Sequence, residues 1–296
     1  MIKIEGLQKS YGTNHVLNGI DLTIDRNEIF GLLGPNGAGK TTMLEIMEGL
    51  RLKNGGKIDI MGYDSEDAVK KGILGVQLQS SSLPNVMTPL DAMTLFCRWR
   101  KQDARRDLLV RFGLEKSMKK PYKHLSTGQK RRLHLALALA HEPDILFLDE
   151  PTAGLDVEGR VSLHEAIKNM KKQGITMVLA SHDMAEVENL CDRVGILVGG
   201  RIKKIGTPAE IIEEVSGEIV LRVKLASPHE YPKFIHAIHL ENKVQGYYQW
   251  KTEHALEGML EVLNYIKTNE LVLLDITLKK QTLEERFIEI AKEERR

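Results

Sequence analysis

Nine consecutive residues near the N-terminus have the types and spacing of a phosphate-binding loop. They match the pattern G-x-x-x-x-G-K-[ST], follow an apolar run at residues 28–33, and precede apolar residues at helical spacing such as Met43 and Leu50. Glycines let the backbone turn its N–H groups toward an anion, and a helix N-terminus adds partial positive charge. We expect Lys40 to reach the β- and γ-phosphates of a nucleotide and Thr41 to bind Mg²⁺. The nine residues are Gly34, Pro35, Asn36, Gly37, Ala38, Gly39, Lys40, Thr41 and Thr42.

Polar residues follow two further apolar runs in the same part of the chain. Residues 145–148 lead into Asp149 and Glu150, and residues 175–180 lead into Ser181 and His182. Strand-like and helix-like patterns alternate here, which predicts an α/β fold with a mostly parallel sheet. Because ligands bind beyond the carboxyl ends of strands in such sheets, we expect these residues to share one site with the phosphate-binding loop.

The remaining periodicity divides this sheet-based part into strands and an insert. Residues 1–27 alternate apolar and polar side chains, which predicts antiparallel strands. Between about residues 85 and 140 the period becomes helical, and we expect a helical insert. Its first apolar stripe indicates core packing, with the alternative that an exposed part receives a partner helix. The stripe consists of Leu90, Met93, Phe96 and Trp99.

A second, smaller domain is predicted at the C-terminal end. Residues 207–210 form a capping box with proline at the first helical position, and that helix should end near Gly217. We therefore expect a domain at residues 1–217 and an α+β accessory domain at residues 218–296. The latter begins with strictly alternating apolar residues, predicts further strands near residues 245–251 and 270–279 with helices between them, and carries no motif that indicates chemistry.

Composition excludes several classes of protein. The chain has 296 residues, 42% hydrophobic and 28% charged, and a net charge of +1, so no basic excess points to a nucleic-acid partner. Cys97 and Cys191 have no metal-like spacing, which favours core packing in a reduced, cytosolic protein. No apolar run is long enough to span a membrane, and the N-terminus lacks the apolar core of a signal peptide. Action at a membrane would therefore require docking on another subunit.

The order of these motifs from Tyr11 to His182 resembles the nucleotide-binding subunit of an ATP-binding cassette (ABC) transporter, over roughly residues 1–215. Residues 125–129 read Leu-Ser-Thr-Gly-Gln and resemble the signature motif of that family, usually Leu-Ser-Gly-Gly-Gln. The resemblance implies a homodimer in which the signature binds the γ-phosphate held by the P-loop of the other subunit. Thr127 replaces the usual first glycine, and we expect modest tuning from it. The signature residues are Ser126, Thr127, Gly128 and Gln129.

The same resemblance assigns roles to single residues around the nucleotide. It implies that Asp149 holds Mg²⁺ through water and that Glu150 is the general base for the attacking water. His182 matches the switch histidine that contacts the γ-phosphate, and Asp156 matches the D-loop that crosses the dimer interface. Tyr11 fits the aromatic residue that stacks on adenine.

One further residue of the nucleotide site has a competitor nearby. Gln79 matches the Q-loop, which binds Mg²⁺ or the attacking water and senses the transmembrane partner through the helical insert. Gln77 is the competing candidate, although the register of residues 75–79 favours Gln79.

Residues 281–287 resemble the C-terminal extension of drug-resistance cassettes of the daunorubicin-exporter type. The resemblance predicts an ATPase subunit, with ATP and Mg²⁺ as ligands, that powers export of an antibiotic-like or lipid-like compound through a separate permease. Such a subunit would be cytoplasmic and peripheral at the inner face of the cell membrane. The alternative is a soluble ABC ATPase that remodels ribosomes or repair complexes, which a single P-loop and the lack of sustained heptads disfavour. An intact Glu150 and His182 disfavour a third interpretation, a regulatory module that binds ATP without hydrolysis.

Overall fold

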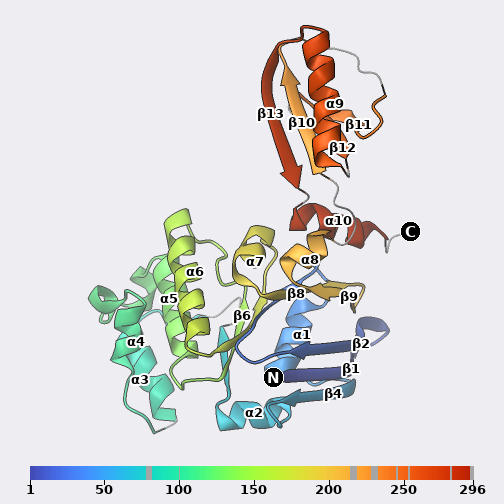
Figure 1. The fold of residues 1–296 in the computed structure, drawn as a ribbon. Helices are drawn as coiled ribbons and strands as arrows, with labels where there is room; N and C mark the ends of the chain where they lie inside the picture. The colour runs from blue at the N-terminus through green and yellow to red at the C-terminus, as the bar shows by residue number, and fades with distance from the viewer. Residues whose placement is uncertain are drawn as a thin grey trace. The chain divides into compact units, whose positions relative to one another are not determined.

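The computed structural model describes residues 1–77, 82–99, 101–213, 219–227, 233–244, 246–252, 254–280 and 282–293. The chain divides into two compact units, Met1–Pro208 with Ala291–Arg296, and Ala209–Ile290. Each unit has its own sheet and core, so the two are described separately (Figure 1).

The first unit begins with a three-stranded antiparallel sheet in the order β2-β1-β4. Alternating side chains of β1 are buried, which confirms the predicted antiparallel strands at the N-terminus. The turn between β1 and β2 follows Tyr11 directly. These strands are β1 (Ile2–Tyr11), β2 (Asn14–Ile24) and β4 (Gly55–Ile60).

A six-stranded sheet in the order β5-β6-β7-β3-β8-β9 forms the centre of the first unit. All neighbouring strands are parallel except β8 and β9, and every residue of β3, β6 and β7 is buried. Burial on both faces explains the continuous apolar runs in the sequence. The strands are β3 (Ile29–Leu33), β5 (Leu74–Gln77), β6 (Ile145–Asp149), β7 (Thr176–Ala180), β8 (Arg193–Val198) and β9 (Arg201–Gly206).

Helix α1 (Lys40–Met47) shares one core with both sheets. Its buried face includes Met43 and Met47, which contact the same cluster as Ile4 of β1 and Phe147 of β6. The helix ends before Leu50, which is 61% exposed, so the prediction that Leu50 continues the apolar face of this helix is wrong. A turn at Gly49, with φ of 72°, leads the chain away from the helix.

The helices between β5 and β6 lie where the helical insert was predicted, and α3, α4 and α5 pack together (Figure 1). The buried face of α3 is formed by Ala92, Met93 and Cys97, whereas Phe96 is 37% exposed. Core packing is thus confirmed for Met93 but not for Phe96, because a spacing of three drifts from the 3.6-residue helical period. The side chain of Trp99 lies outside what the structure describes, and docking of a partner helix on the exposed part stays a prediction. These elements are α3 (Pro89–Trp99), α4 (Arg106–Arg111), α5 (Thr127–Ala138) and the 3₁₀ turns Glu115–Ser117 and Tyr122–His124.

Backbone hydrogen bonds connect the start of this insert to the segment just before α5. The N–H groups of Tyr122 and Lys123 donate to the carbonyls of Met87 and Asn85, at 2.9 and 3.1 Å. The segment that follows the Q-loop is thus tied directly to the segment that leads into the signature.

Of the remaining helices before the second sheet, α6 and α7 follow strands whose ends carry polar residues. Helix α6 begins right after Asp156, and α7 begins right after Asp183. Among the described residues, no helix is both long and apolar enough to cross a lipid bilayer. The helices are α2 (Ser65–Lys71), α6 (Val157–Lys172), α7 (Met184–Leu190) and α8 (Pro208–Glu213), the last at the division between the two units.

The second unit contains a four-stranded antiparallel sheet in the order β11-β12-β10-β13, with α9 packed on one face. Leu221, Val223 and the fully buried Trp250 contact Val262 and Ile266 of this helix in one small core. Strand β11 was not predicted. The elements are β10 (Ile219–Leu225), β11 (Ile238–Val244), β12 (Tyr247–Thr252), α9 (Ala255–Thr268), β13 (Leu273–Lys280) and α10 (Leu283–Glu293).

Candidate active site

The loop between β3 and α1 has a backbone that only glycine fits at several positions. Gly37 and Gly39 have φ of 80° and 105°, in a region that other residues rarely adopt. A Cβ atom on Gly39 would lie 3.0 Å from the carbonyl oxygen of Val16, and one on Gly34 would lie 2.5 Å from that of Leu197. The glycine spacing of the motif therefore reflects close backbone packing on both sides of the loop.

Lys40 and the two threonines start α1 at the end of this loop. The N-cap Gly39 provides no side-chain cap, so the first N–H groups of α1 can bind an anion. The Lys40 Nζ donates to the carbonyls of Gly34 and Pro35, at 2.7 and 3.2 Å. Burial lowers the pKa of Lys40, while Glu150 and Asp149 oppose that shift. An ammonium held over the loop, close to two carboxylates, can bind phosphate oxygens.

Asp149 and Glu150 are both buried where β6 ends. Burial, and then the charge of Glu150, raises the pKa of Asp149 to about 6, with Lys40 opposing. Glu150 has φ of 50°, an unusual conformation that its N–H stabilises by donating to the carbonyl of Ala180 at 2.9 Å. Strained backbone of this kind concentrates at functional sites.

His182 meets Glu150 because strands β6 and β7 are adjacent and parallel. Asp149 pairs with Ala180 in register, so the residues that follow the two strands emerge together. The His182 Nδ1 lies 2.7 Å from the Glu150 Oε2. The structure thus brings together four predicted residues, Lys40, Asp149, Glu150 and His182, at one edge of the sheet.

The donor set suits a magnesium ion. Burial, and then the neighbouring Glu150, raises the pKa of Asp149, and a divalent cation would favour its charged form. Thr41, the second residue of α1, offers a hydroxyl. Within the described part of the chain no group of three or more histidine, cysteine or acidic residues could hold a metal. That fits a cation bound by one or two side chains, with phosphates and water supplying the other ligands.

One of the predicted nucleotide contacts, Tyr11, stands apart from this group. A cavity of about 500 Å³ beside the P-loop is lined by residues of that loop together with His15, Val16 and Gly200, but not by Tyr11. Tyr11 is 42% exposed, and its ring lies 5.0 Å from the Lys9 Nζ. Stacking of Tyr11 on adenine stays a prediction.

Only one of the two glutamine candidates for the Q-loop lies within the described residues. Gln79, the predicted one, lies outside the described residues. Gln77, the competing candidate, is 1% exposed in β5, and its amide has no hydrogen-bond partner among the described residues. The choice between Gln79 and Gln77 therefore stays a prediction.

The signature residues open α5 with a reciprocal cap. The Gln129 N–H donates to the Ser126 Oγ at 3.2 Å, and the Ser126 N–H donates to the Gln129 Oε1 at 3.0 Å. Gly128 has ordinary φ, and a Cβ atom there would find its nearest neighbour, Leu155 Cδ2, at 3.7 Å. The fold of this chain therefore does not require glycine at position 128.

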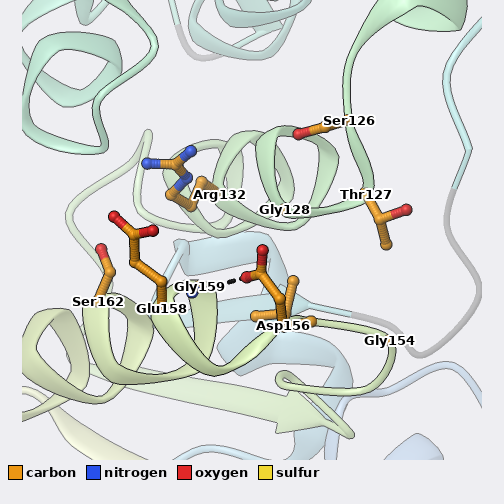
Figure 2. A pocket seen from close by; sticks show the side chains of 10 residues that line it. Ser126, Thr127, Gly128, Arg132, Gly154, Asp156, Glu158, Gly159 and Ser162 are labelled. Carbon is orange, nitrogen blue, oxygen red and sulfur yellow. Dashed lines mark hydrogen bonds between the residues drawn. The ribbon is translucent and has the colours of Figure 1, made fainter.

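The signature and the D-loop line a second cavity, of about 490 Å³ (Figure 2). Asp156 caps α6 by accepting a hydrogen bond from the Gly159 N–H at 2.9 Å. No P-loop residue lines this cavity. The lining residues are Ser126, Thr127, Gly128, Arg132, Gly154, Leu155, Asp156, Glu158, Gly159 and Ser162.

Two residues near these sites, Arg132 and Glu186, were not predicted from the sequence. Arg132 lines the second cavity, and its position one helical turn after Gln129 could have indicated this. Glu186 lies buried on α7 and accepts a hydrogen bond from Ser181, and its place four residues after His182 was the available signal.

Several known proteins are similar to this chain in sequence. The family model described as "ABC transporter" matches residues 17–153. The daunorubicin resistance ATP-binding protein DrrA3 of Streptomyces coeruleorubidus is 31% identical, over 100% of this chain and 97% of that protein. The linearmycin resistance ATP-binding protein LnrL of Bacillus subtilis is 32% identical, over 78% and 76%. The Nod factor export ATP-binding protein I of Rhizobium etli is 35% identical, over 79% and 77%.

Solved structures show the same fold. The ATP-binding subunit of an ABC transporter superposes with a TM-score of 0.66 at 28% identity, covering 72% of this chain and 92% of that one. A dimeric cassette bound to ADP and phosphate superposes with a TM-score of 0.64, covering 70% and 98%. The fold and the site thus define a P-loop ATPase of the cassette type. The chain belongs to the family of ABC transporter ATP-binding proteins, and it binds and hydrolyses ATP. The predicted fold class and the resemblance to drug-resistance cassettes are confirmed.

Proposed function

We propose that this subunit powers export of a small antibiotic-like or lipid-like compound through a separate membrane permease. The observation that carries the proposal is the similarity to DrrA3, which runs along the whole chain and so includes the second unit as well as the cassette. The names of LnrL and of the Nod factor export protein point to the same class of transporter. The subunit would then lie on the cytoplasmic side, held at the inner face of the cell membrane by the permease.

For hydrolysis we assign Glu150 as the general base, with His182 as its hydrogen-bonded neighbour and contact to the γ-phosphate. The 2.7 Å distance between His182 Nδ1 and Glu150 Oε2 supports this, because it fixes the carboxylate next to the P-loop. Lys40 binds the β- and γ-phosphates. Thr41 and Asp149 would hold Mg²⁺, Asp149 through water, with Gln79 as a predicted further ligand. Bound Mg²⁺ neutralises charge on the transferred phosphoryl group.

For assembly we propose a head-to-tail homodimer in which the signature of one chain closes on the ATP held by the other. The Ser126 Oγ accepts from its own helix, which leaves the hydroxyl hydrogen to donate to a phosphate oxygen. The space at Gly128 lets a phosphate approach the N–H groups that open α5. Asp156 lies beside this surface, and Tyr11 would stack on the adenine.

The export proposal is tested by finding the membrane partner. The full chain carrying Glu150→Gln is captured with ATP from detergent-solubilised membranes, and the bound protein is identified. We expect one polytopic permease that, reconstituted with the wild-type chain in proteoliposomes, transports an antibiotic-like or lipid-like compound only with ATP. Glu150→Gln is the inactive control. Capture of ribosomal or repair proteins, or reconstituted vesicles without transport, would contradict the proposal.

We also propose that the chain divides functionally near Gly217, with residues 218–296 serving regulation or dimer support. Every residue assigned to nucleotide chemistry lies before this boundary. The separate core around Trp250 supports an independently packed second unit. Residues 1–217 should therefore purify as a folded fragment with wild-type ATP affinity, as measured by thermal denaturation and nucleotide titration. An insoluble fragment would show that the two parts need each other to fold.

A further inference from the structure

A buried acid lies behind His182. Glu186 on α7 is 1% exposed, and the Ser181 hydroxyl, itself 0% exposed, donates to its Oε2 at 2.5 Å. Acidic side chains are almost never fully buried unless they are paired, because desolvation of a carboxylate is costly. The position of Glu186 therefore calls for a role that an apolar residue could not fill.

Two side chains of helix α6, one helical turn apart, make polar contacts with Asp183 and Glu186. The Arg160 Nη1 lies 3.0 Å from the Asp183 Oδ2, and the His164 Nε2 lies 3.5 Å from the Glu186 Oε1. Asp183 also caps α7, accepting from the Glu186 N–H at 3.1 Å. Arg160, Asp183 and Glu186 thus tie the helix that follows the D-loop to the segment that contains the switch histidine.

The residues on both sides of His182 are therefore held by side-chain contacts. Glu186 accepts a hydrogen bond from Ser181, and Arg160 donates one to Asp183. The Asp183 N–H in turn donates to the Ser181 Oγ at 3.1 Å. The His182 side chain is 70% exposed, so packing does little to fix it. Its distance to Glu150 depends on where its own backbone is placed.

We propose that Glu186 is a positioning residue for hydrolysis, which fixes the backbone at Ser181 so that His182 stays within hydrogen-bond distance of Glu150. Arg160 is the second tether, through Asp183. The inference rests on the proposed roles of His182 and Glu150. A carboxyl side chain suits this task because one oxygen accepts from Ser181 and the other lies 3.5 Å from His164 of α6. Since α6 starts at the D-loop residue Asp156, movement of the D-loop would reach His182 by this route.

The first test compares three variants of the full chain. We expect Glu186→Ala to lower kcat by roughly 10- to 100-fold, the scale on which a misplacement of about 1 Å reduces rate. KM and the Kd for ATP should stay within about twofold, because the P-loop contacts are untouched. Glu186→Gln should regain most of the activity, because its amide oxygen can still accept from Ser181. Glu188→Ala, on the exposed side of the same helix, is the matched control and should match wild type.

The second test separates this inference from the function on which it rests. If His182→Ala alone leaves hydrolysis unchanged, the role of His182 fails, whatever Glu186 does. If His182→Ala slows hydrolysis, adding Glu186→Ala should slow it by less than about twofold more, since the two act through one group. Independent, multiplicative losses would overturn the inference, as would a fall in ATP affinity equal to the fall in kcat. Should Glu186→Ala not fold, the same cycle with Arg160→Ala, whose side chain is 45% exposed, decides by the same criterion.

Discussion

The two surfaces that we propose to meet around one ATP are built in opposite ways. On the P-loop side, a Cβ atom on Gly34 would collide with the Leu197 carbonyl at 2.5 Å, and one on Gly39 would lie 3.0 Å from the Val16 carbonyl oxygen. On the signature side, a Cβ atom on Gly128 would meet nothing closer than 3.7 Å. The P-loop side is therefore fixed by the interior of its own chain. On the signature side a methyl group would make only ordinary contact, so the fold of the chain does not explain the glycine there, and the proposed contact with a second chain would.

Electrostatics follow the same division. Burial raises the pKa of Glu48 and of Asp149 on the P-loop side and lowers that of Lys40, so burial disfavours charge on this side. A bound nucleotide and cation would favour the charged forms of Lys40 and Asp149. On the signature side Asp156 is exposed and caps its own helix. Removing a group should thus disturb chemistry or stability on the P-loop side, and assembly on the signature side.

The largest effect is expected from Glu150→Gln, which keeps the shape of the side chain but removes its basicity. Loss of a general base should lower kcat by roughly 10²–10⁴-fold while ATP still binds. Steady-state hydrolysis and nucleotide titration measure the two quantities, and Glu165→Gln on the exposed face of α6 is the control. Wild-type turnover in Glu150→Gln would place the base elsewhere.

The next effect tests whether the signature side serves another chain. Ser126→Arg puts bulk and charge where the γ-phosphate of the second ATP must lie, so in a Glu150→Gln background it should abolish the ATP-dependent dimer. Size-exclusion chromatography with ATP reports the dimer, and titration should give an unchanged Kd for the monomer. A dimer that still forms would mean that the signature does not act in trans.

The difference between the two sides also explains what the sequence could predict. The P-loop, Asp149, Glu150 and His182 were predictable because each follows a strand or glycine pattern within a few residues. The buried face of α3 was predictable only in part. Core packing was expected for Cys97, which is buried, but also for Phe96, which is 37% exposed because tertiary contacts decide which apolar side chains lie inside. The contact between Glu186 and Ser181 was not predicted either, because helical spacing alone does not show that a glutamate turns inward.

A matched pair of substitutions compares the two sides directly. Gly34→Ala should lower stability by about 1–3 kcal/mol, because the backbone must shift around the new methyl group. Gly128→Ala should leave the Tm unchanged and reduce hydrolysis by about tenfold, the effect of losing about 1.4 kcal/mol of contact in trans. Thermal denaturation and ATPase assays of both variants give the comparison. A stable Gly34→Ala together with an unstable Gly128→Ala would reverse our assignment of the two sides.

The smallest effect concerns Glu48, which follows α1 and is 2% exposed with no hydrogen-bond partner for its Oε1 among the described residues. Burial, then Asp149 and Glu45, raises its pKa from 4.5 to about 8. A raised pKa means that the folded state holds the proton longer than the unfolded state. The stability this contributes is complete below pH 4.5 and is lost as the pH rises toward 8.

Glu48→Gln stays neutral at every pH, so it should match wild type near pH 5 and become more stable than wild type by on the order of 10 °C near pH 8, at roughly 2–4 °C per kcal/mol. Tm measured at several pH values gives the difference. Glu66→Gln on the exposed face of α2 is the control and should show no trend, because its carboxylate is solvated in both states. A constant difference for Glu48→Gln between pH 5 and pH 8 would show that this carboxyl is ionised throughout. Burial would then not shift the ionisation of Glu48, and backbone confinement would be the clearer difference between the two sides.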